Sequence, residues 1–380
     1  MMNNFKRDIE SSIRARLFET GKIIVLYGPR QVGKTTLAKE ILESFDSVQG
    51  YFNCEDNSVA SALASHNATT MHTFFSGSKI IVLDEAQSVT NIGRALKILI
   101  DAYPDMNIIA TGSSSFDLAN KINEPLTGRH YEYFLYPISF NEIAERDGNR
   151  ALFETINSRS IYGSYPEVLS ATSFDDARER LKNLTTSYLY RDVFKFQNIR
   201  NPDILGKILR ALAFQVGSEV SYTEIAGLVG VDKNTVINYI RLLEQAFIVF
   251  RLSSFSRSLR NEIKRGQKYY FYDNGVISAL TENYSDATTG RDIGGLWENL
   301  MIAERLKYNQ NHKLYKNLYF WRLKNAGEID LIEESNGVLN PFEFKWSKDK
   351  TGLSARKFET EYGTEPTQVI NKENFINFVR

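Results

Sequence analysis

Phosphate-binding chemistry is indicated by nine consecutive residues near the start of the chain. They read Gly28-Pro-Arg-Gln-Val-Gly-Lys-Thr-Thr36 and fit the pattern G-x-x-x-x-G-K-[ST]. The glycines let the backbone curl so that successive N–H groups face phosphate oxygens, and a following helix would add the positive end of its dipole. Lys34 would reach the β- and γ-phosphates of ATP, and Thr35 would hold Mg²⁺. The predicted cofactor-binding residues of this loop are Gly28, Pro29, Arg30, Gln31, Val32, Gly33, Lys34, Thr35 and Thr36.

A strand and a helix must flank this loop if it is to bind a nucleotide. The run Ile23–Tyr27 before it is apolar, and residues 37–42 after it favour a helix. The alternative is a glycine-rich turn that binds nothing. The strand–loop–helix context argues against that alternative.

A second apolar run ends in two adjacent carboxylates, Asp84 and Glu85. Asp84 would bind the magnesium shell, and Glu85 would orient and polarise the attacking water as a catalytic residue. The alternative is a solvated strand end. The next apolar run ends in hydroxyl groups, so Thr111 or Ser113 is expected to sense the γ-phosphate, although a polar strand end needs no function.

Arg129 precedes the last strand-like run of the N-terminal region. An arginine there could act as a catalytic finger on a neighbouring subunit's γ-phosphate, an effect worth roughly 10³–10⁵ in rate. That role would require a homo-oligomer with shared ATP sites. A surface arginine paired with an acidic neighbour explains the same spacing equally well. Arg30 is a second phosphate-facing candidate with weaker support.

The C-terminal region carries another set of acidic and basic residues. Glu343 and Lys345 would share one side of a strand, and Asp330 on the adjacent strand would come close to them. The carboxylates of Asp330 and Glu343, completed by Glu298 from a preceding helix, would hold a divalent metal. Lys345 would position the attacking water, and Arg322 would contact a phosphate. An ordinary half-exposed strand is the alternative for any single one of these residues.

Residues 222–243 follow a helix–turn–helix rhythm. Lys233, Asn234, Thr235 and Asn238 would face outward at the start of the second helix, where base edges are read. A basic ribbon follows, and as a wing it could neutralise DNA phosphates. The alternative is a module that packs against the rest of the protein with its ribbon solvated. The cations of this ribbon are Arg251, Arg257, Arg260, Lys264, Arg265 and Lys268.

Composition sets limits on these hypotheses. The chain has 380 residues, 42% of them hydrophobic and 24% charged, which describes a globular protein of more than one domain. The 46 basic residues balance the 46 acidic ones, so any nucleic-acid surface must be local. A single cysteine excludes an internal disulfide and a cysteine-rich zinc site. No membrane-length apolar run and no signal-peptide core are seen, so a cytoplasmic protein without membrane partners is expected.

The pattern of apolar runs predicts an α/β protein built from several domains. Strands of a parallel sheet are expected at Ile23–Tyr27 and at residues 50–53, 79–84, 107–111 and 131–135. Three further strands are expected at residues 318–323, 328–333 and 341–346, after a helix around residues 297–306. Residues 281–294 are expected to form a linker, and an N-terminal helix with Arg7 is expected to pack rather than bind nucleic acid.

The chain resembles prokaryotic AAA-type P-loop ATPases that are fused to a helix-turn-helix and a C-terminal domain of unknown function. The matching motifs are GPRQVGKTT, IVLDEAQ, ATGSSS, LTGRHYEYFLYPISFNE, YLYRDV and YYFYDNG. The C-terminal carboxylates with Lys345 resemble the PD-(D/E)xK nuclease layout. The resemblance implies a lid that places residues 163–166 near the adenine, with Ser164 where the family usually has glycine, and it makes Arg191 a candidate second sensor.

The implied fold is a P-loop AAA-type ATPase core with a helical lid, a winged helix-turn-helix and a C-terminal restriction-endonuclease-like α/β domain. The expected function is Mg-ATP hydrolysis that controls DNA binding, or metal-dependent cleavage by the C-terminal domain. The alternative is an ATP-dependent switch or scaffold whose nuclease-like domain binds nucleic acid or protein without cutting. The corresponding segments are residues 1–140, 141–203, 204–285 and 286–380.

Overall fold

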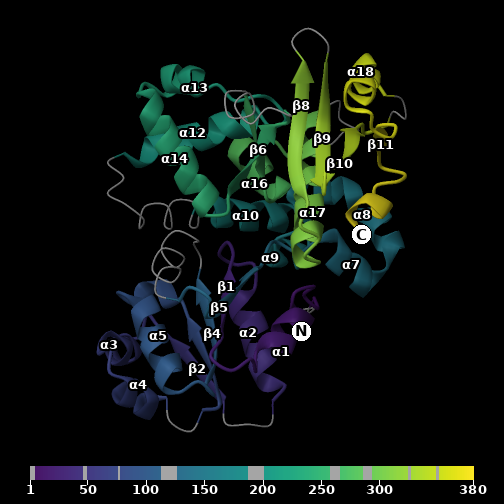
Figure 1. Cartoon of the computed structure of the whole chain (residues 1–380). Helices are drawn as coiled ribbons and strands as arrows, with labels where there is room; N and C mark the ends of the chain where they lie inside the picture. The colour runs from purple at the N-terminus through teal and green to yellow at the C-terminus, as the bar shows by residue number, and fades with distance from the viewer. Residues whose placement is uncertain are drawn as a thin grey trace.

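The computed structural model of the chain has a sheet in each of two lobes (Figure 1). The lower lobe in that view holds the N-terminal strands, and the upper lobe holds the C-terminal sheet and most of the later helices. Among the described residues, no helix combines the length and apolar character needed to cross a membrane. The structure describes residues 5–45, 49–75, 78–112, 126–186, 201–256, 266–285, 293–323, 327–347 and 351–380.

The N-terminal sheet is parallel and has the strand order β2-β3-β4-β1-β5. The central strand β1 and its near neighbour β3 are buried at every position, as expected for parallel strands covered by helices on both faces. All five strands were predicted, and their ends lie within one residue of the predicted ones. The strands are β1 (Ile23–Tyr27), β2 (Gln49–Asn53), β3 (Ile80–Asp84), β4 (Asn107–Gly112) and β5 (His130–Phe134).

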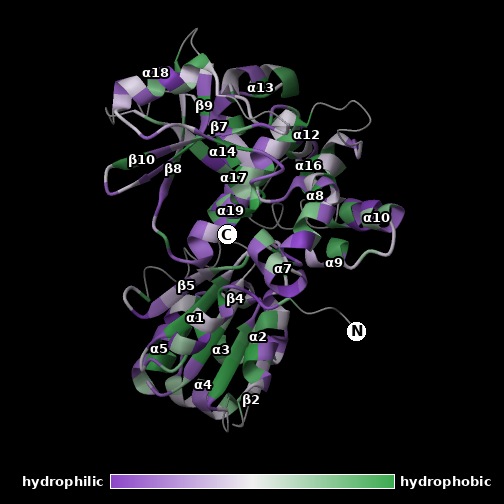
Figure 2. Ribbon diagram, turned by 90° about the vertical axis from the view of Figure 1, so that its right-hand side faces the viewer, coloured by the Kyte–Doolittle hydropathy of each residue, from purple (hydrophilic) through white to green (hydrophobic). Residues whose placement is uncertain are grey.

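Helices cover both faces of this sheet, and the strands alternate their side chains between two apolar cores. Ile24 and Leu26 point to the core shared with α1 and α2, whereas Ile23 and Val25 point to the core shared with α3 to α5. Figure 2 shows these strands as a hydrophobic band enclosed by helices with polar outer faces. The helices are α1 (Glu10–Arg16), α2 (Lys34–Glu43), α3 (Asn57–Ala64), α4 (Ala68–Phe74), the short 3-10 helix η1 (Ala86–Ser88) and α5 (Ile92–Ala102).

A helical region follows β5, as predicted. Within it, α13 and α14 are joined by a short turn in which Gly230 is left-handed with φ +74°, and Asp232 caps α14 by accepting from the Thr235 N–H. The helices are α7 (Phe140–Asp147), α8 (Asn149–Tyr162), α9 (Pro166–Leu169), α10 (Phe174–Leu184), α12 (Pro202–Phe214), α13 (Tyr222–Val229), α14 (Lys233–Gln245) and α16 (Asn274–Thr281).

The second sheet is mixed and has the strand order β11-β10-β9-β8-β6-β7. Helix α17 packs on one face, and α18 packs on the other face with Trp321 and Ile329. The predicted strands are present, but β9 and β10 extend beyond their predicted starts. The elements are β6 (Val249–Ser254), β7 (Gln267–Phe271), α17 (Gly294–Asn311), β8 (Asn317–Leu323), β9 (Gly327–Ser335), β10 (Val338–Phe344), α18 (Leu353–Tyr362), β11 (Gln368–Ile370) and α19 (Ile376–Val379).

The basic ribbon belongs to the same sheet as the C-terminal strands. Ser253 and Ser254 of β6 pair in parallel with Tyr319 and Phe320 of β8. A division between residues 285 and 286 therefore separates strands of a single sheet. Local sequence patterns indicate that a strand exists but do not indicate its distant partner, which is why the sequence placed this ribbon with the helix-turn-helix.

Candidate functional site

The phosphate-binding loop connects β1 to α2 at the carboxyl edge of the parallel sheet, where ligands of such sheets bind. Gly28 has φ +150°, and a Cβ there would lie 2.1 Å from the carbonyl oxygen of Leu135, so a side chain is sterically excluded. Gly33 is left-handed with φ +96° and immediately precedes α2. The loop conformation thus depends on both glycines of the motif.

Lys34 is buried at the start of α2, and its ammonium group turns back to the loop. It donates to the carbonyl oxygens of Gly28 at 2.9 Å and of Pro29 at 2.8 Å. A flexible ammonium held by loop carbonyls can exchange them for phosphate oxygens of a nucleotide. The reach of Lys34 to the β- and γ-phosphates stays a prediction.

The two predicted magnesium ligands of this site lie side by side. The Thr35 hydroxyl donates to Asp84 Oδ2 at 2.8 Å, and the Tyr51 hydroxyl donates to the same oxygen at 2.6 Å. Hydroxyl and carboxylate oxygens are the donors that Mg²⁺ prefers, and it binds through few protein ligands plus the phosphates. The residues therefore fit a magnesium ion that would neutralise phosphate charge.

Thr111, in β4, contacts both residues of the acidic pair. Its side chain is fully buried, its hydroxyl donates to the other oxygen of Asp84, and it accepts from the Glu85 N–H at 3.2 Å. Thr111 therefore positions the carboxylate pair, and its role as a γ-phosphate sensor stays a prediction. The sequence could not show this, because a hydroxyl at a strand end can serve either role. The other sensor candidate, Ser113, lies outside the described residues.

Glu85 follows β3 at the same edge of the sheet. It is half-buried, has a left-handed backbone with φ +54°, and its carboxylate accepts from the Gln87 side-chain amide. A non-glycine residue in this region is unusual and is found often at functional sites. Its role in orienting water stays a prediction.

The Arg7 side chain contacts the phosphate-binding loop and stabilises it. The sequence did not indicate this role. Its buried guanidinium donates to the Val32 carbonyl at 2.7 Å, to the Tyr136 carbonyl at 2.6 Å and to Glu142 at 2.9 Å. The N-terminal segment, the phosphate-binding loop and α7 are thereby joined through one side chain. No local motif marks such a residue, because its partners are distant in the sequence.

The two candidate arginines lie at different places. Arg30 is half-buried within the loop. Arg129 lies just before β5, at the amino edge of the sheet and opposite the loop, where its Nε lies 2.9 Å from Asp101 Oδ1. Arg129 therefore makes the surface ion pair that the sequence analysis gave as the alternative. Because it lies at the opposite edge of the sheet, it is not part of its own chain's phosphate site.

The segment that was predicted to lie near the adenine packs against the start of α16, and its contact with adenine stays a prediction. The Ser164 N–H donates to Asp273 Oδ2 at 2.7 Å, and a Cβ on Gly163 would lie 1.8 Å from Asp273 Oδ1. Burial raises the pKa of Asp273. The Lys307 ammonium and the N–H donors of Ser164 and Gly275 oppose that shift. Residues 163–166 therefore connect the lid to the second lobe, and Arg191 lies outside the described residues.

In the second sheet, the predicted residues Asp330, Glu343 and Lys345 lie near one another. The Phe344 N–H donates to Asp330 Oδ2 at 2.7 Å, and Lys345 Nζ lies 3.7 Å from Glu343 Oε2. Burial raises the pKa of both Asp330 and Glu343, and nearby lysines oppose that shift. Arg322 is half-exposed and lies 3.9 Å from Glu219.

Glu298 is engaged differently from our prediction. Its Oε1 accepts from Lys268 at 3.0 Å and from the Tyr270 hydroxyl at 2.6 Å, and burial raises its pKa to about 7. Within the described ranges, no group of three or more acidic, histidine or cysteine side chains could hold a metal ion. These residues therefore do not fit the expected metal site. Lys268 is fully buried, so the expectation that it faces DNA is wrong.

The outward face of α14 keeps the polar residues that the sequence predicted. Lys233, Asn234 and Asn238 are exposed, whereas Thr235 is half-buried and bonded to Asp232. Four of the ribbon cations, Arg257, Arg260, Lys264 and Arg265, lie outside the described residues.

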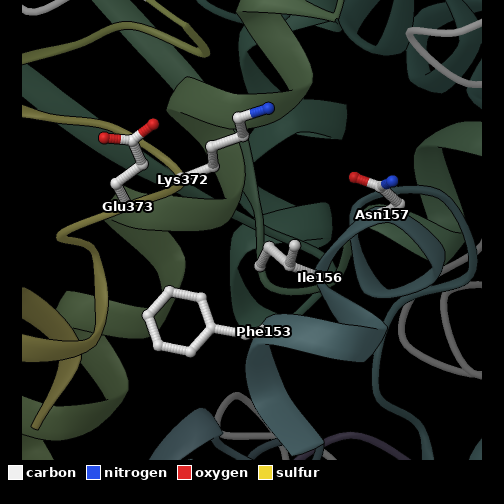
Figure 3. A pocket seen from close by; sticks show the side chains of 5 residues that line it. All are labelled: Phe153, Ile156, Asn157, Lys372 and Glu373. Atoms are coloured by element: carbon white, nitrogen blue, oxygen red, sulfur yellow. The ribbon is translucent and has the colours of Figure 1, made fainter. Parts of the chain in front are cut away.

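A pocket of about 410 Å³ lies away from both of these sites (Figure 3). Phe153 and Ile156 of α8 line its apolar side, and Lys372 and Glu373 face them from the segment before α19. None of the predicted site residues lines this pocket.

Comparison with known protein families identifies one domain in the first lobe and two further domains after it. Residues 20–144 match the family profile described as AAA domain, and residues 153–287 and 293–376 match domains of unknown function, DUF8612 and DUF4143. An uncharacterized protein of Mycobacterium tuberculosis is 26% identical over 345 residues, 90% of this chain and 74% of that protein. One of Methanocaldococcus jannaschii is 27% identical over 333 residues, 82% and 72% of the two chains.

Solved structures with some likeness include those of two bacterial proteins. AMPPCP-bound DnaA from Aquifex aeolicus is 17% identical with a TM-score of 0.31, covering 62% of this chain and 86% of that one. The Holliday junction branch migration motor RuvB of Thermotoga maritima is 18% identical with a TM-score of 0.31, covering 66% and 87%. At TM-scores this low neither likeness carries an argument. The family match and the loop geometry together support an AAA-type ATPase domain at residues 20–144.

Proposed function

We propose that this chain hydrolyses Mg-ATP and uses its nucleotide state to control nucleic-acid binding by the second lobe. The observation that carries this proposal is the arrangement at the carboxyl edge of the first sheet. There Lys34 lies at the loop carbonyls, and Thr35 and Thr111 both donate to Asp84. These are the groups needed to bind phosphates, to hold magnesium and to fix the acidic pair.

The chemistry divides among these residues in a simple way. Magnesium, when bound, would neutralise charge on the β- and γ-phosphates. Lys34 would stabilise the negative charge that develops on the transferred phosphoryl group, and Glu85 would orient the attacking water. Tyr51 and Thr111 hold Asp84 in place, so its carboxylate needs little reorganisation when the nucleotide binds.

Buried hydrogen bonds between the lobes support control by nucleotide state. Ile138, just after β5, donates to the Ser164 carbonyl at 3.0 Å, and Ser164 donates in turn to Asp273. The Phe140 N–H donates to Glu304 of α17 at 2.7 Å, and Glu304 pairs with Lys307. A movement at the ATP site would therefore have a continuous set of contacts through which to act on the second lobe.

The exposed polar face of α14 supports nucleic acid as the partner. Lys233, Asn234 and Asn238 are of the types that contact phosphates and base edges, and they lie at the start of a helix that follows a short turn. A winged helix and a restriction-endonuclease-like domain remain part of this proposal. A homo-oligomer is also part of it, since Arg129 could reach a phosphate only in a neighbouring subunit.

Metal-dependent DNA cleavage is not part of this proposal. Asp330, Glu343 and Lys345 lie close together on β9 and at the end of β10, but the described carboxylates do not fit a metal site, and Lys268 engages Glu298.

Nucleotide-dependent DNA affinity tests the proposal. A fluorescein-labelled duplex is titrated with protein alone, with ADP and with a non-hydrolysable ATP analogue, and anisotropy is read. We expect the dissociation constants to differ by about tenfold, a coupling typical of allosteric proteins. Lys233→Ala should weaken binding in every state, whereas Lys182→Ala, an exposed lysine on α10, should not. Equal affinities in all nucleotide states would rule out the switch.

A further inference from the structure

Lys268 occupies an unusual place for a lysine. Its side chain has no exposed surface. It is the second residue of β7, where Leu252 of β6 is its partner in the ladder. Its ammonium lies 3.0 Å from Glu298 Oε1 and 3.1 Å from Glu328 Oε1. A fully buried lysine is costly unless it is paired, so these two carboxylates stabilise its charge.

The ammonium joins elements that are distant in the sequence. Glu298 comes from α17, and Glu328 comes from β9, two residues before Asp330 on the same strand. Tyr270, two residues after Lys268 on β7, donates to the same Glu298 oxygen. Strand β7 therefore supplies both a positive charge and a hydroxyl donor to carboxylates of the C-terminal sheet.

A cation is thus already present among the acidic side chains. Lys268 forms ion pairs with both Glu298 and Glu328, and Lys345 lies beside Glu343. A divalent ion would need these oxygens as ligands, and it would meet a fixed positive charge among them. Lys345 is partly exposed and can swing away, but Lys268 is fixed by its strand.

We propose that Lys268 is a built-in counter-ion that closes this carboxylate cluster to divalent metals. It takes the charge-balancing place that a metal would take, and it engages the Glu298 oxygen that a metal would need as a ligand. The proposal is independent of ATP hydrolysis. It implies that the C-terminal sheet binds no metal at Asp330 while Lys268 is in place.

Direct metal binding tests this proposal without any assay of cleavage. Mn²⁺ binding to nucleotide-free, full-length protein is measured by electron paramagnetic resonance for the wild type and for Asp330→Asn. Manganese bound near Asp84 is common to both proteins, so their difference reports the second sheet alone. We expect no difference. A manganese ion bound by the wild type and lost in Asp330→Asn would overturn the proposal.

Removing the lysine gives the complementary result. Lys268→Met keeps an unbranched side chain of nearly the same length and removes its charge. We expect it to gain one Mn²⁺ site, at least about tenfold tighter than any binding that the wild type shows at Asp330. The double variant with Asp330→Asn should lose that site. Lys268→Gln serves as a second variant if Lys268→Met does not fold. A folded variant that gains no site would show that Lys268 does not exclude the metal.

Discussion

Replacing Lys34 with alanine is expected to lower ATP turnover by roughly 10²–10³-fold, the loss typical when one preorganised charge-stabilising donor is removed from an active site. The ammonium lies at the carbonyls of Gly28 and Pro29, within the loop that would surround the phosphates. Phosphate release under saturating Mg-ATP measures the effect directly.

The matched control for this variant is Arg94→Ala. Arg94 is exposed on α5 of the same lobe, so its removal changes the net charge equally and should leave turnover within about twofold, as is usual for surface substitutions. If Lys34→Ala also retained turnover within that range, the phosphate site would not be where the loop geometry places it.

Replacing Arg7 with methionine is expected to lower the free energy of unfolding by about 3–5 kcal/mol, because it leaves the buried carboxylate of Glu142 without its cation. Glu142 is 1% exposed and lies 2.9 Å from Arg7 Nε. Two carbonyl acceptors, of Val32 and Tyr136, also lose their donor. A urea titration followed by far-ultraviolet circular dichroism measures the loss.

Arg14→Ala provides the comparison for Arg7. Arg14 also makes an ion pair, with Glu10 at 2.7 Å, but its side chain is 28% exposed. Solvent screens that pair, so its removal should cost under about 1 kcal/mol. Equal small losses in the two variants would mean that the Arg7 contacts do not stabilise the fold.

The phosphate site could be predicted from the sequence because its determinants are local. The apolar run of β1, the two glycines and Lys34 are contiguous, so their spacing alone fixes the strand, the turn and the helix start. Asp84 is marked in the same way by the apolar strand that precedes it. The Thr35–Asp84 hydrogen bond joins two of these locally marked residues.

The roles of other residues depended on contacts between distant segments. Lys268 looked like a solvent-facing cation because its neighbours in the sequence are basic, but β6 pairs with β8 and brings it among the carboxylates. Arg7 depends on Glu142, 135 positions away. The position of residues 163–166 depends on Asp273, because its carboxylate lies so close to Gly163 that a Cβ there would overlap it. No periodicity or motif records such long-range pairings.

The central claim is that residues 20–144 form a working Mg-ATP site, and equilibrium binding tests it most directly. Isothermal titration of the full chain with ATP should show one site in the presence of Mg²⁺. Binding should weaken when the metal is chelated, because Thr35 and Asp84 then have no ion to hold. It should weaken further in Lys34→Ala. An absence of ATP binding with Mg²⁺, or binding unchanged by the Lys34 substitution, would contradict the account.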